Sequence, residues 1–256
     1  MTSLTARITD EQRQQFCKEG YFIVEDAVEP DHLDLLRNTC DALIEETDAQ
    51  IDRGELDQVR EITHKDKRYF IDGAYARRPE LESFLFSNAM ADICRATIGP
   101  NAYLFKNQFV VKCAEVGMKF GWHQDSGYIP ESHSPYLSCW CALDDVTEDS
   151  GTVYILPWSR AGGSDIREHK REQGSNDLVG YFGDDPGVPV VVRAGGIAVF
   201  SSTALHRSGA NQSNQIRRVY LTQYSPEIMP SKAGTTRQAV PFLRDGKSVR
   251  PCTTSR

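Results

Sequence analysis

Three side chains from two distant stretches of the chain have the types and spacing that bind a transition metal. His123 and Asp125 stand two residues apart in Gly-Trp-His-Gln-Asp-Ser-Gly, so an extended backbone there projects both side chains toward one side. His206 follows the apolar run Ile-Ala-Val-Phe-Ser-Ser-Thr-Ala-Leu, and a strand returning beside the first would bring its imidazole to the same point. Two histidines and one carboxylate suit non-haem Fe(II) and leave open coordination positions. Zinc more often takes three histidines or thiolates and needs only one open position.

An arginine that follows the second histidine in the sequence indicates which ligand could occupy the open coordination positions. Arg217 follows His206 by eleven residues (217 − 206 = 11). A guanidinium holds a carboxylate through two parallel hydrogen bonds, which a lysine cannot copy. A chelating 2-oxo acid needs both parts, because its 1-carboxylate and 2-keto group bind the metal while its distal carboxylate binds the arginine. Of the neighbours Arg217 and Arg218, one is expected to be a surface residue.

The remaining histidines are predicted to be surface residues rather than ligands. One lies at a helix start and the others in polar or charged stretches: His32, His64, His133 and His169. Because charged and polar segments are mostly solvated, we expect none of the four to bind the metal.

Composition excludes several classes of protein. The chain has 256 residues, with 36 Asp and Glu against 29 Lys and Arg, for a formal net charge of −7. A nucleic-acid or anionic-membrane binder needs a basic surface instead. The seven cysteines are scattered and include no C-x-x-C, so neither a disulfide framework nor a zinc ribbon is expected. Without a secretory signal or a long apolar run, the protein is predicted to be cytoplasmic.

The first hundred residues are predicted to be mainly helical. A capping box at Thr9-Asp-Glu-Gln12 opens a helix that ends near Gly20, and Tyr21–Val24 reads as a short strand. A second helix begins at Pro30 and fades before Gly54, and a third helical region spans 79–98.

After Pro100 the pattern becomes that of short strands separated by Gly, Pro, Asp and Ser clusters. The strands are expected at 103–113, 137–143, 152–156, 188–192, 197–200 and 219–224. Two long connections, 114–135 and 157–187, interrupt them, and loops of that length often carry function. The fold class is therefore mainly β with flanking helices, an antiparallel sandwich or jelly roll. One domain is expected over 1–256, with a helical portion 1–100, a β core 101–225 and a C-terminal tail 226–256.

Several ordered blocks give the sequence a family resemblance. They are Trp122-His-Gln-Asp125, Cys139-Trp-Cys-Ala-Leu-Asp-Asp145, Glu148-Asp-Ser-Gly-Thr-Val-Tyr-Ile-Leu-Pro-Trp-Ser159 and Gly195-Gly-Ile-Ala-Val-Phe-Ser-Ser-Thr-Ala-Leu-His-Arg-Ser-Gly-Ala-Asn211, preceded by Phe16-Cys-Lys-Glu-Gly-Tyr-Phe-Ile-Val24. The chain resembles the phytanoyl-CoA dioxygenase (PhyH) family of Fe(II)/2-oxoglutarate oxygenases. This resemblance implies a double-stranded β-helix (jelly roll, cupin-like), with Fe(II) as cofactor and 2-oxoglutarate and O2 as cosubstrates.

The resemblance also assigns roles to residues. The metal ligands would be His123, Asp125 and His206, and Arg217 would hold the 5-carboxylate of 2-oxoglutarate. Further cosubstrate contacts are expected from Ser208, Trp140, Gln108, Thr152 and Lys112. The family's usual Pro-Gly-Ser-His reads Pro157-Trp-Ser-Arg160 here. A supporting role like that of the family's histidine is therefore not expected at position 160, and the metal triad is unaffected. The carboxylate of Asp125, where related halogenases have a small residue, favours hydroxylation over halogenation.

The resemblance leaves the substrate open. Trp122, Tyr128 and Tyr136 are candidates for the substrate side. Two segments have a net positive charge by their Lys and Arg minus Asp and Glu counts, 60–78 (6 − 3 = +3) and 226–256 (6 − 2 = +4). Such segments would suit an anionic small-molecule substrate. The protein is expected to be a monomer or a homodimer. Two alternatives remain: a cupin-like metal-dependent dioxygenase or isomerase that does not use 2-oxoglutarate, and a non-catalytic binding domain of the same fold.

Overall fold

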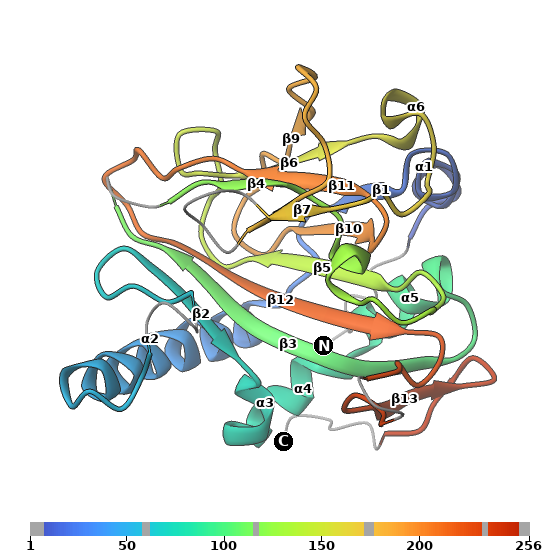
Figure 1. Ribbon diagram of the computed structural model, residues 1–256. Helices are drawn as coiled ribbons and strands as arrows, with labels where there is room; N and C mark the ends of the chain where they lie inside the picture. Colours follow the sequence, from blue (N-terminus) through green and yellow to red (C-terminus); the bar gives the residue numbers. More distant parts are fainter. Residues whose placement is uncertain (1–7, 58–61, 115–117, 172–176, 232–234, 251–256) are drawn as a thin grey trace.

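Two antiparallel sheets face each other, and helices cover the outer side of the larger one (Figure 1). The computed structural model describes residues 8–57, 62–114, 118–171, 177–231 and 235–250. Parts of the predicted second long connection and of both basic segments, including Arg60, lie outside these residues. Among the described residues, no helix combines the length and apolar character needed to cross a bilayer.

The main sheet supplies one wall of the molecule's interior. Its strands are, in spatial order, β1 (Tyr21–Val24), β10 (Ile197–Ser201), β5 (Leu137–Ala142), β12 (Arg217–Ser225), β3 (Ala102–Lys112), β13 (Val240–Arg244) and β14 (Lys247–Ser248), with β2 (Arg68–Asp72) also pairing with β3. The minor sheet has the order β4 (Phe120–His123), β11 (Leu205–Ser208), β6 (Val153–Leu156) and β9 (Val188–Pro189). A separate ribbon pairs β7 (Lys170–Arg171) with β8 (Leu178–Val179).

Most of the helices pack their apolar sides on the main sheet, whereas the short helix at Trp158–Ala161 packs on the minor sheet beside Leu156 and Leu205. They are α1 (Asp10–Glu19), α2 (Pro30–Asp52), α3 (Ala74–Arg77), α4 (Glu82–Leu85), α5 (Asn88–Thr97) and α6 (Trp158–Ala161), with 3₁₀ turns η1 (Pro79–Leu81) and η2 (Asp125–Tyr128). The core joins the buried faces of α2 and α5 to the outward side of β3 and β12, through Leu36, Leu43, Ile93, Phe109 and Tyr220. Successive residues of a strand alternate between faces, so Phe109 and Val111 face the helices while Gln108 and Lys112 face the interior cavity.

The predicted helix ends are confirmed at α1 and α2. The Thr9 hydroxyl accepts the N–H of Gln12, and the Gln12 side chain in turn accepts the N–H of Thr9. Gly20 is left-handed at φ 79°. A Cβ there would also lie 2.5 Å from the ring of Trp158, so this position needs glycine for both conformation and space. Pro30 begins α2 as predicted.

The structure differs from the prediction at several elements. The connections predicted at 114–135 and 157–187 contain the short strands β4, β7 and β8. The helical region 79–98 is broken at Phe86, after which Ser87 caps α5. The predicted helical portion contains an additional strand, β2, which pairs with β3. The strand predicted at 188–192 is reduced to β9, and the predicted tail contributes β13 to the main sheet. Each of these elements is short or depends on pairing with β3 or β6, so its own sequence carries little signal.

Removing the Phe109 ring tests the contact between sheet and helices. The ring is fully buried against Tyr220, with ring centroids 4.4 Å apart. Phe109→Ala should lower the free energy of unfolding by about 3–5 kcal/mol, because it leaves a cavity in a packed core. Phe182, which is 73% exposed, offers the matched control: Phe182→Ala should change stability little. Denaturant titration of both variants measures this, and equal stabilities would contradict the described packing.

Candidate active site

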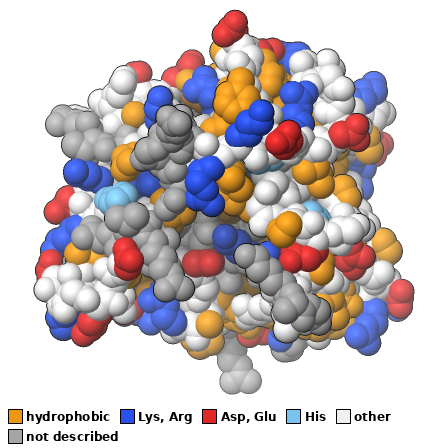
Figure 2. Space-filling view, in the orientation of Figure 1, with side chains coloured by type: hydrophobic (Ala, Val, Ile, Leu, Met, Phe, Trp, Pro, Cys, Tyr) orange, Lys and Arg blue, Asp and Glu red, His pale blue; other side chains and the backbone are white. Residues whose placement is uncertain are grey.

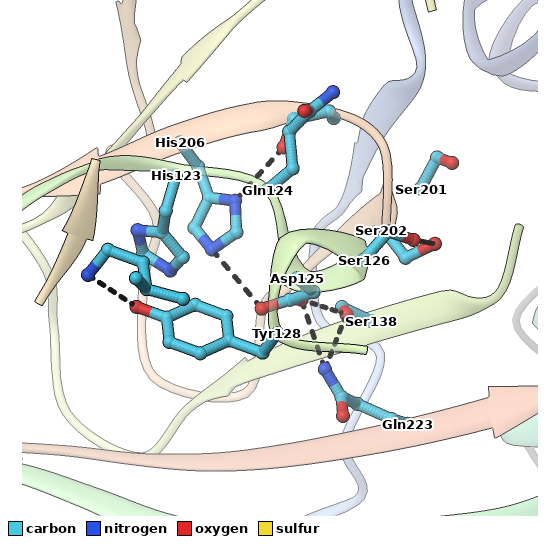
Figure 3. Close-up of polar contacts among 12 residues, drawn as sticks. His123, Gln124, Asp125, Ser126, Tyr128, Ser138, Ser201, Ser202, His206 and Gln223 are labelled. Atoms are coloured by element: carbon cyan, nitrogen blue, oxygen red, sulfur yellow. Dashed lines mark hydrogen bonds and ion pairs between the residues drawn. The ribbon is translucent and has the colours of Figure 1, made fainter. Parts of the chain in front are cut away.

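The metal-binding triad is assembled by the pairing of two short strands. On β11, His206 is the direct antiparallel partner of His123 on β4, with ring centroids 4.1 Å apart. The chain leaves β4 through Gln124, which is extended (φ −111°, ψ 138°), into η2. The Asp125 Oδ1 atom then lies 3.7 Å from His206 Nε2. One ligand atom from each of the three residues lies within 4.8 Å of the others, and Figure 3 shows the side chains pointing toward one another.

Hydrogen bonds to the backbone fix both imidazoles for metal binding. His123 Nδ1 lies 2.8 Å from the carbonyl of Gly121, and His206 Nδ1 lies 3.1 Å from that of Ala204. A proton on Nδ1 satisfies each contact and leaves Nε2 free as a ligand. Burial, together with the neighbouring His206 imidazole, holds the pKa of His123 well below its usual range. The neutral ring that results is the form that binds a metal.

The Asp125 carboxylate is held from behind by two side chains that sequence analysis missed. Its Oδ2 accepts hydrogen bonds from Ser138 Oγ at 2.5 Å and Gln223 Nε2 at 3.0 Å (Figure 3). Oδ1 is left facing the two imidazoles. Ser138 and Gln223 are direct partners across β5 and β12, so only the strand register could have identified them. Such contacts orient a ligand and tune its basicity.

A second set of contacts clamps the loop between the first two ligands. Gln124 points away from the triad and donates to the carbonyls of Asp165 (2.9 Å) and Thr203 (2.6 Å). Its backbone N–H donates to His169 Nε2 at 2.9 Å. As predicted, His169 does not belong to the triad, but the expectation that it is a surface residue is wrong. It is partly buried, so close to Gly127 that a Cβ there would clash at 2.3 Å.

The other three histidines also lie outside the triad. The surface prediction fails in part for all three of them, His32, His64 and His133, which are partly buried. His32 packs edge-on against Phe84, and His133 contacts Ser126 Oγ at 3.0 Å. Neither contact could be predicted from the sequence, because Phe84 is distant from His32 along the chain and the His133 contact is made within a loop.

Two buried cations stand at one end of the interior. Arg217 is 1% exposed, and its guanidinium carbon lies 5.5 Å from the centroid of the Trp140 ring. Its terminal nitrogens make only long contacts to the carbonyls of Val110 (3.4 Å) and Gly151 (3.3 Å). Its Nε has no hydrogen-bond partner among the described residues. Lys112, its direct partner across β12 and β3, donates to Ser208 Oγ at 2.8 Å and to the carbonyl of Gly209.

Neither of these two cations forms an ion pair with a carboxylate of the described residues, and Asp144 acts on Arg217 only from a distance. Burial lowers the pKa of Arg217 to about 10, and burial reinforced by Arg217 holds the pKa of Lys112 well below its usual range. Burying charge without an opposite charge is unfavourable, so this end of the interior fits an anionic group. Arg218, by contrast, lies on the face of β12 away from the cavity and pairs with Asp144 and Asp41. Its side chain is only 15% exposed, so the expectation that one of the two arginines is a surface residue is wrong.

A cavity of about 360 Å³ joins the triad to the two cations. Figure 2 shows a recess near the middle of this face of the molecule, with Lys or Arg side chains beside it. The cavity brings together ten of the twelve residues named from the sequence: Gln108, Lys112, His123, Asp125, Tyr128, Tyr136, Trp140, His206, Ser208 and Arg217.

Two predicted site residues do not line this cavity. Trp122 precedes His123 on β4 and so faces the opposite side, where it packs on Tyr181 and under Arg207. Thr152 is fully buried, and its hydroxyl donates to the carbonyl of Val190. The departure at 157–160 is equally remote, since Arg160 pairs with Asp185 on the surface.

Comparisons with known proteins agree with this geometry. The sequence profile of the family described as Phytanoyl-CoA dioxygenase (PhyH) matches residues 16–219. The chain is 24% identical over 272 aligned residues to phytanoyl-CoA dioxygenase domain-containing protein 1 of Danio rerio, covering 86% of this chain and 94% of that protein.

Solved structures share the fold. The non-heme alpha ketoglutarate dependent carbocyclase SnoK from nogalamycin biosynthesis superposes with a TM-score of 0.68 at 20% identity, covering 94% of this chain and 93% of that one. EvdO2 from Micromonospora carbonacea var. aurantiaca, solved with 2-oxoglutarate, superposes with a TM-score of 0.69 at 19% identity, covering 91% and 96%. The expected double-stranded β-helix is thereby confirmed. With an intact facial triad of His123, Asp125 and His206, the chain belongs to the phytanoyl-CoA dioxygenase family of Fe(II)/2-oxoglutarate-dependent oxygenases.

Proposed function

We propose that this oxygenase hydroxylates an unactivated C–H bond of a small-molecule substrate, with release of succinate and CO2. The observation that carries the proposal is the pair of buried cations, Arg217 and Lys112, which have no ion-pair partner among the described residues and lie in the same cavity as the triad. With Fe(II) and 2-oxoglutarate bound, such a site uses O2 to decarboxylate the cosubstrate and oxidise the substrate. The protein's contribution is to bind, orient and exclude water.

The polar residues at the triad and at the Arg217 end of the cavity each have a part in this proposal. His123 Nε2, His206 Nε2 and Asp125 Oδ1 hold the metal. Arg217 takes the distal carboxylate of 2-oxoglutarate through its planar fork, and Lys112 adds a second positive charge from the neighbouring strand. Gln108, Ser208 and Trp140 line the space between. Thr152 has no part, because its hydroxyl is already bonded to Val190.

The choice of hydroxylation rests on Asp125. A carboxylate at this position occupies one coordination site of the metal, which a halogenase keeps free for halide. Ser138 and Gln223 hold this carboxylate in place, so it is a fixed ligand rather than a mobile one. The apolar side chains of Phe120, Val153 and Phe200 also line the cavity, and they limit the access of water to the reacting centre.

The proposal includes a reducing location such as the cytoplasm. The six cysteines among the described residues are all free thiols, and four of them are buried in the core: Cys40, Cys94, Cys139 and Cys141. Free thiols persist where glutathione and thioredoxin keep them reduced.

Loss of a triad ligand tests the proposed reaction. With Fe(II), ascorbate and O2, the purified protein should convert 2-oxoglutarate to succinate. His206→Ala or Asp125→Ala should reduce the rate by more than about 100-fold, since even residues that only support a ligand are worth 10–100-fold. His64→Ala, outside the cavity lining, is the control and should keep full activity. A wild-type protein that neither binds nor consumes 2-oxoglutarate would refute the proposal.

The neighbouring arginines provide a matched test of cosubstrate binding. Arg217→Lys should raise the KM for 2-oxoglutarate by about 10- to 100-fold, because a charged hydrogen bond contributes about 1.5–3 kcal/mol. Arg218→Lys makes the same chemical change at a guanidinium that pairs with Asp144 on the other face of the strand, and it should leave the KM for 2-oxoglutarate unchanged. The two alternatives considered above predict instead that neither substitution matters to a reaction without 2-oxoglutarate.

The lowered pKa of Lys112 predicts a pH dependence of cosubstrate affinity. Only the protonated amine attracts a carboxylate, so the affinity for 2-oxoglutarate should fall as pH rises through this pKa, which burial and Arg217 hold well below its usual range. Anaerobic titration of wild type over the pH range in which the protein stays folded, kept below the pKa of about 10 of Arg217, should show the decline. Lys112→Met should bind more weakly and show no decline in this range. A flat profile for wild type would contradict the assignment.

A further inference from the structure

The cavity has a second basic end, on the opposite side of the triad from Arg217. The residues that share the interior face of β3 are Lys106, Gln108, Val110 and Lys112. Lys106 and Lys112 are six residues apart, which is about 20 Å along a strand at about 3.3 Å per residue. This separation exceeds the length of a five-carbon dicarboxylate. A 2-oxoglutarate bound at Lys112 therefore cannot also reach the Lys106 end.

Lys106 lies beside the support of the metal ligand. It is the direct partner of Gln223 across β3 and β12, and Gln223 donates to Asp125 Oδ2. Side chains opposite each other on one face of a sheet have Cβ atoms about 4.5–5.5 Å apart. A group held by Lys106 would thus sit next to the triad, on the side away from Arg217.

Arg237 completes this end of the cavity with a preoriented fork. Its backbone N–H donates to the carbonyl of Met229, and its Nε donates to that of Pro230 at 3.2 Å. The arginine lines the cavity near Tyr136. None of the described residues gives its terminal nitrogens a hydrogen bond or an ion pair, and the same is true of Lys106 Nζ. Two cationic side chains therefore face the cavity with unused donors.

The rest of this end is mainly apolar and holds one acid besides the metal ligand Asp125, whose charge the metal takes up. Phe105, Ile129 and Leu221 line it, and the Phe105 ring packs edge-on against Tyr136 at 4.9 Å. Asp72 also belongs to the wall, and its Oδ1 accepts the N–H of Gly73. Two cations against one carboxylate leave a positive balance. Since the cavity measures about 360 Å³, near the lower end of ligand sites, and must also hold the cosubstrate, it suits a small occupant.

We propose that Arg237 and Lys106 bind the carboxylate of a small, partly apolar acid substrate. This contact would place the carbon atoms next to that carboxylate close to the metal site. This inference rests on the proposed function, because it assumes that 2-oxoglutarate occupies the Arg217 end. The planar guanidinium provides the bidentate contact, Lys106 adds the second charge, and the ring and aliphatic walls take the apolar body.

The test compares acids with neutral analogues of the same shape. The protein is loaded anaerobically with Fe(II) and saturating 2-oxoglutarate, and binding of benzoate, benzamide, hexanoate and hexanamide is measured by ligand-observed NMR. Each acid should bind at least about tenfold more tightly than its amide, as expected for a charged hydrogen-bonded contact. Arg237→Gln and Lys106→Gln should each reduce this preference, whereas Arg244→Gln, an exposed arginine on β13, should retain it.

The outcomes separate this inference from the proposed function. If the protein binds 2-oxoglutarate but does not prefer either acid over its amide, or if the preference persists in Arg237→Gln, the carboxylate site is refuted while the oxygenase reaction stands. Tighter binding of phenylphosphonate than of benzoate would also refute it, in favour of a phosphorus oxyanion. Failure to bind 2-oxoglutarate at all would refute the proposed function first. Because Arg237 is only partly buried, its substitution should leave 2-oxoglutarate affinity and folding intact.

Discussion

The antiparallel pairing of β4 with β11 is the constraint on which the active site depends. It makes His123 and His206 direct partners, and a slip of one residue would turn one imidazole to the other face of the sheet. The register is secured on both sides. On one side β6 pairs with β11, placing Ile155 opposite His206. On the other, Gln124 and His169 clamp the loop that follows β4. The triad is thus preorganised by backbone pairing.

One strand of the main sheet serves both stability and chemistry. On β3, Phe109 and Val111 pack against the helices, while Gln108 and Lys112 face the cavity. Holding Lys112 and Arg217 buried without a carboxylate is unfavourable, and the large apolar contact on the other face of the same strand offsets this. Proteins commonly accept such destabilised groups where a ligand will complete them. The site is therefore preorganised to bind an anion.

Local sequence patterns were sufficient to predict those elements that have a recognisable cap, proline or apolar run of their own. The capping box at Thr9, Pro30 and the apolar run of β10 identified their elements, and the H-x-D spacing with His206 and Arg217 identified the triad and the inward arginine. The remaining features depend on contacts distant in sequence. Ser138 and Gln223 reach Asp125 only through the β5–β12 register. Strands β2 and β13 exist because β3 offers them an edge. Trp122 was misplaced because residues adjacent on a strand face opposite sides.

The most direct test of the account is an anaerobic crystal structure with Fe(II) and 2-oxoglutarate, with anomalous scattering measured at the iron edge. The account predicts one iron bound by His123 Nε2, Asp125 Oδ1 and His206 Nε2, with the distal carboxylate of 2-oxoglutarate on the Arg217 guanidinium. Iron bound elsewhere, or a cosubstrate whose distal carboxylate lies away from Arg217 and Lys112, would contradict it.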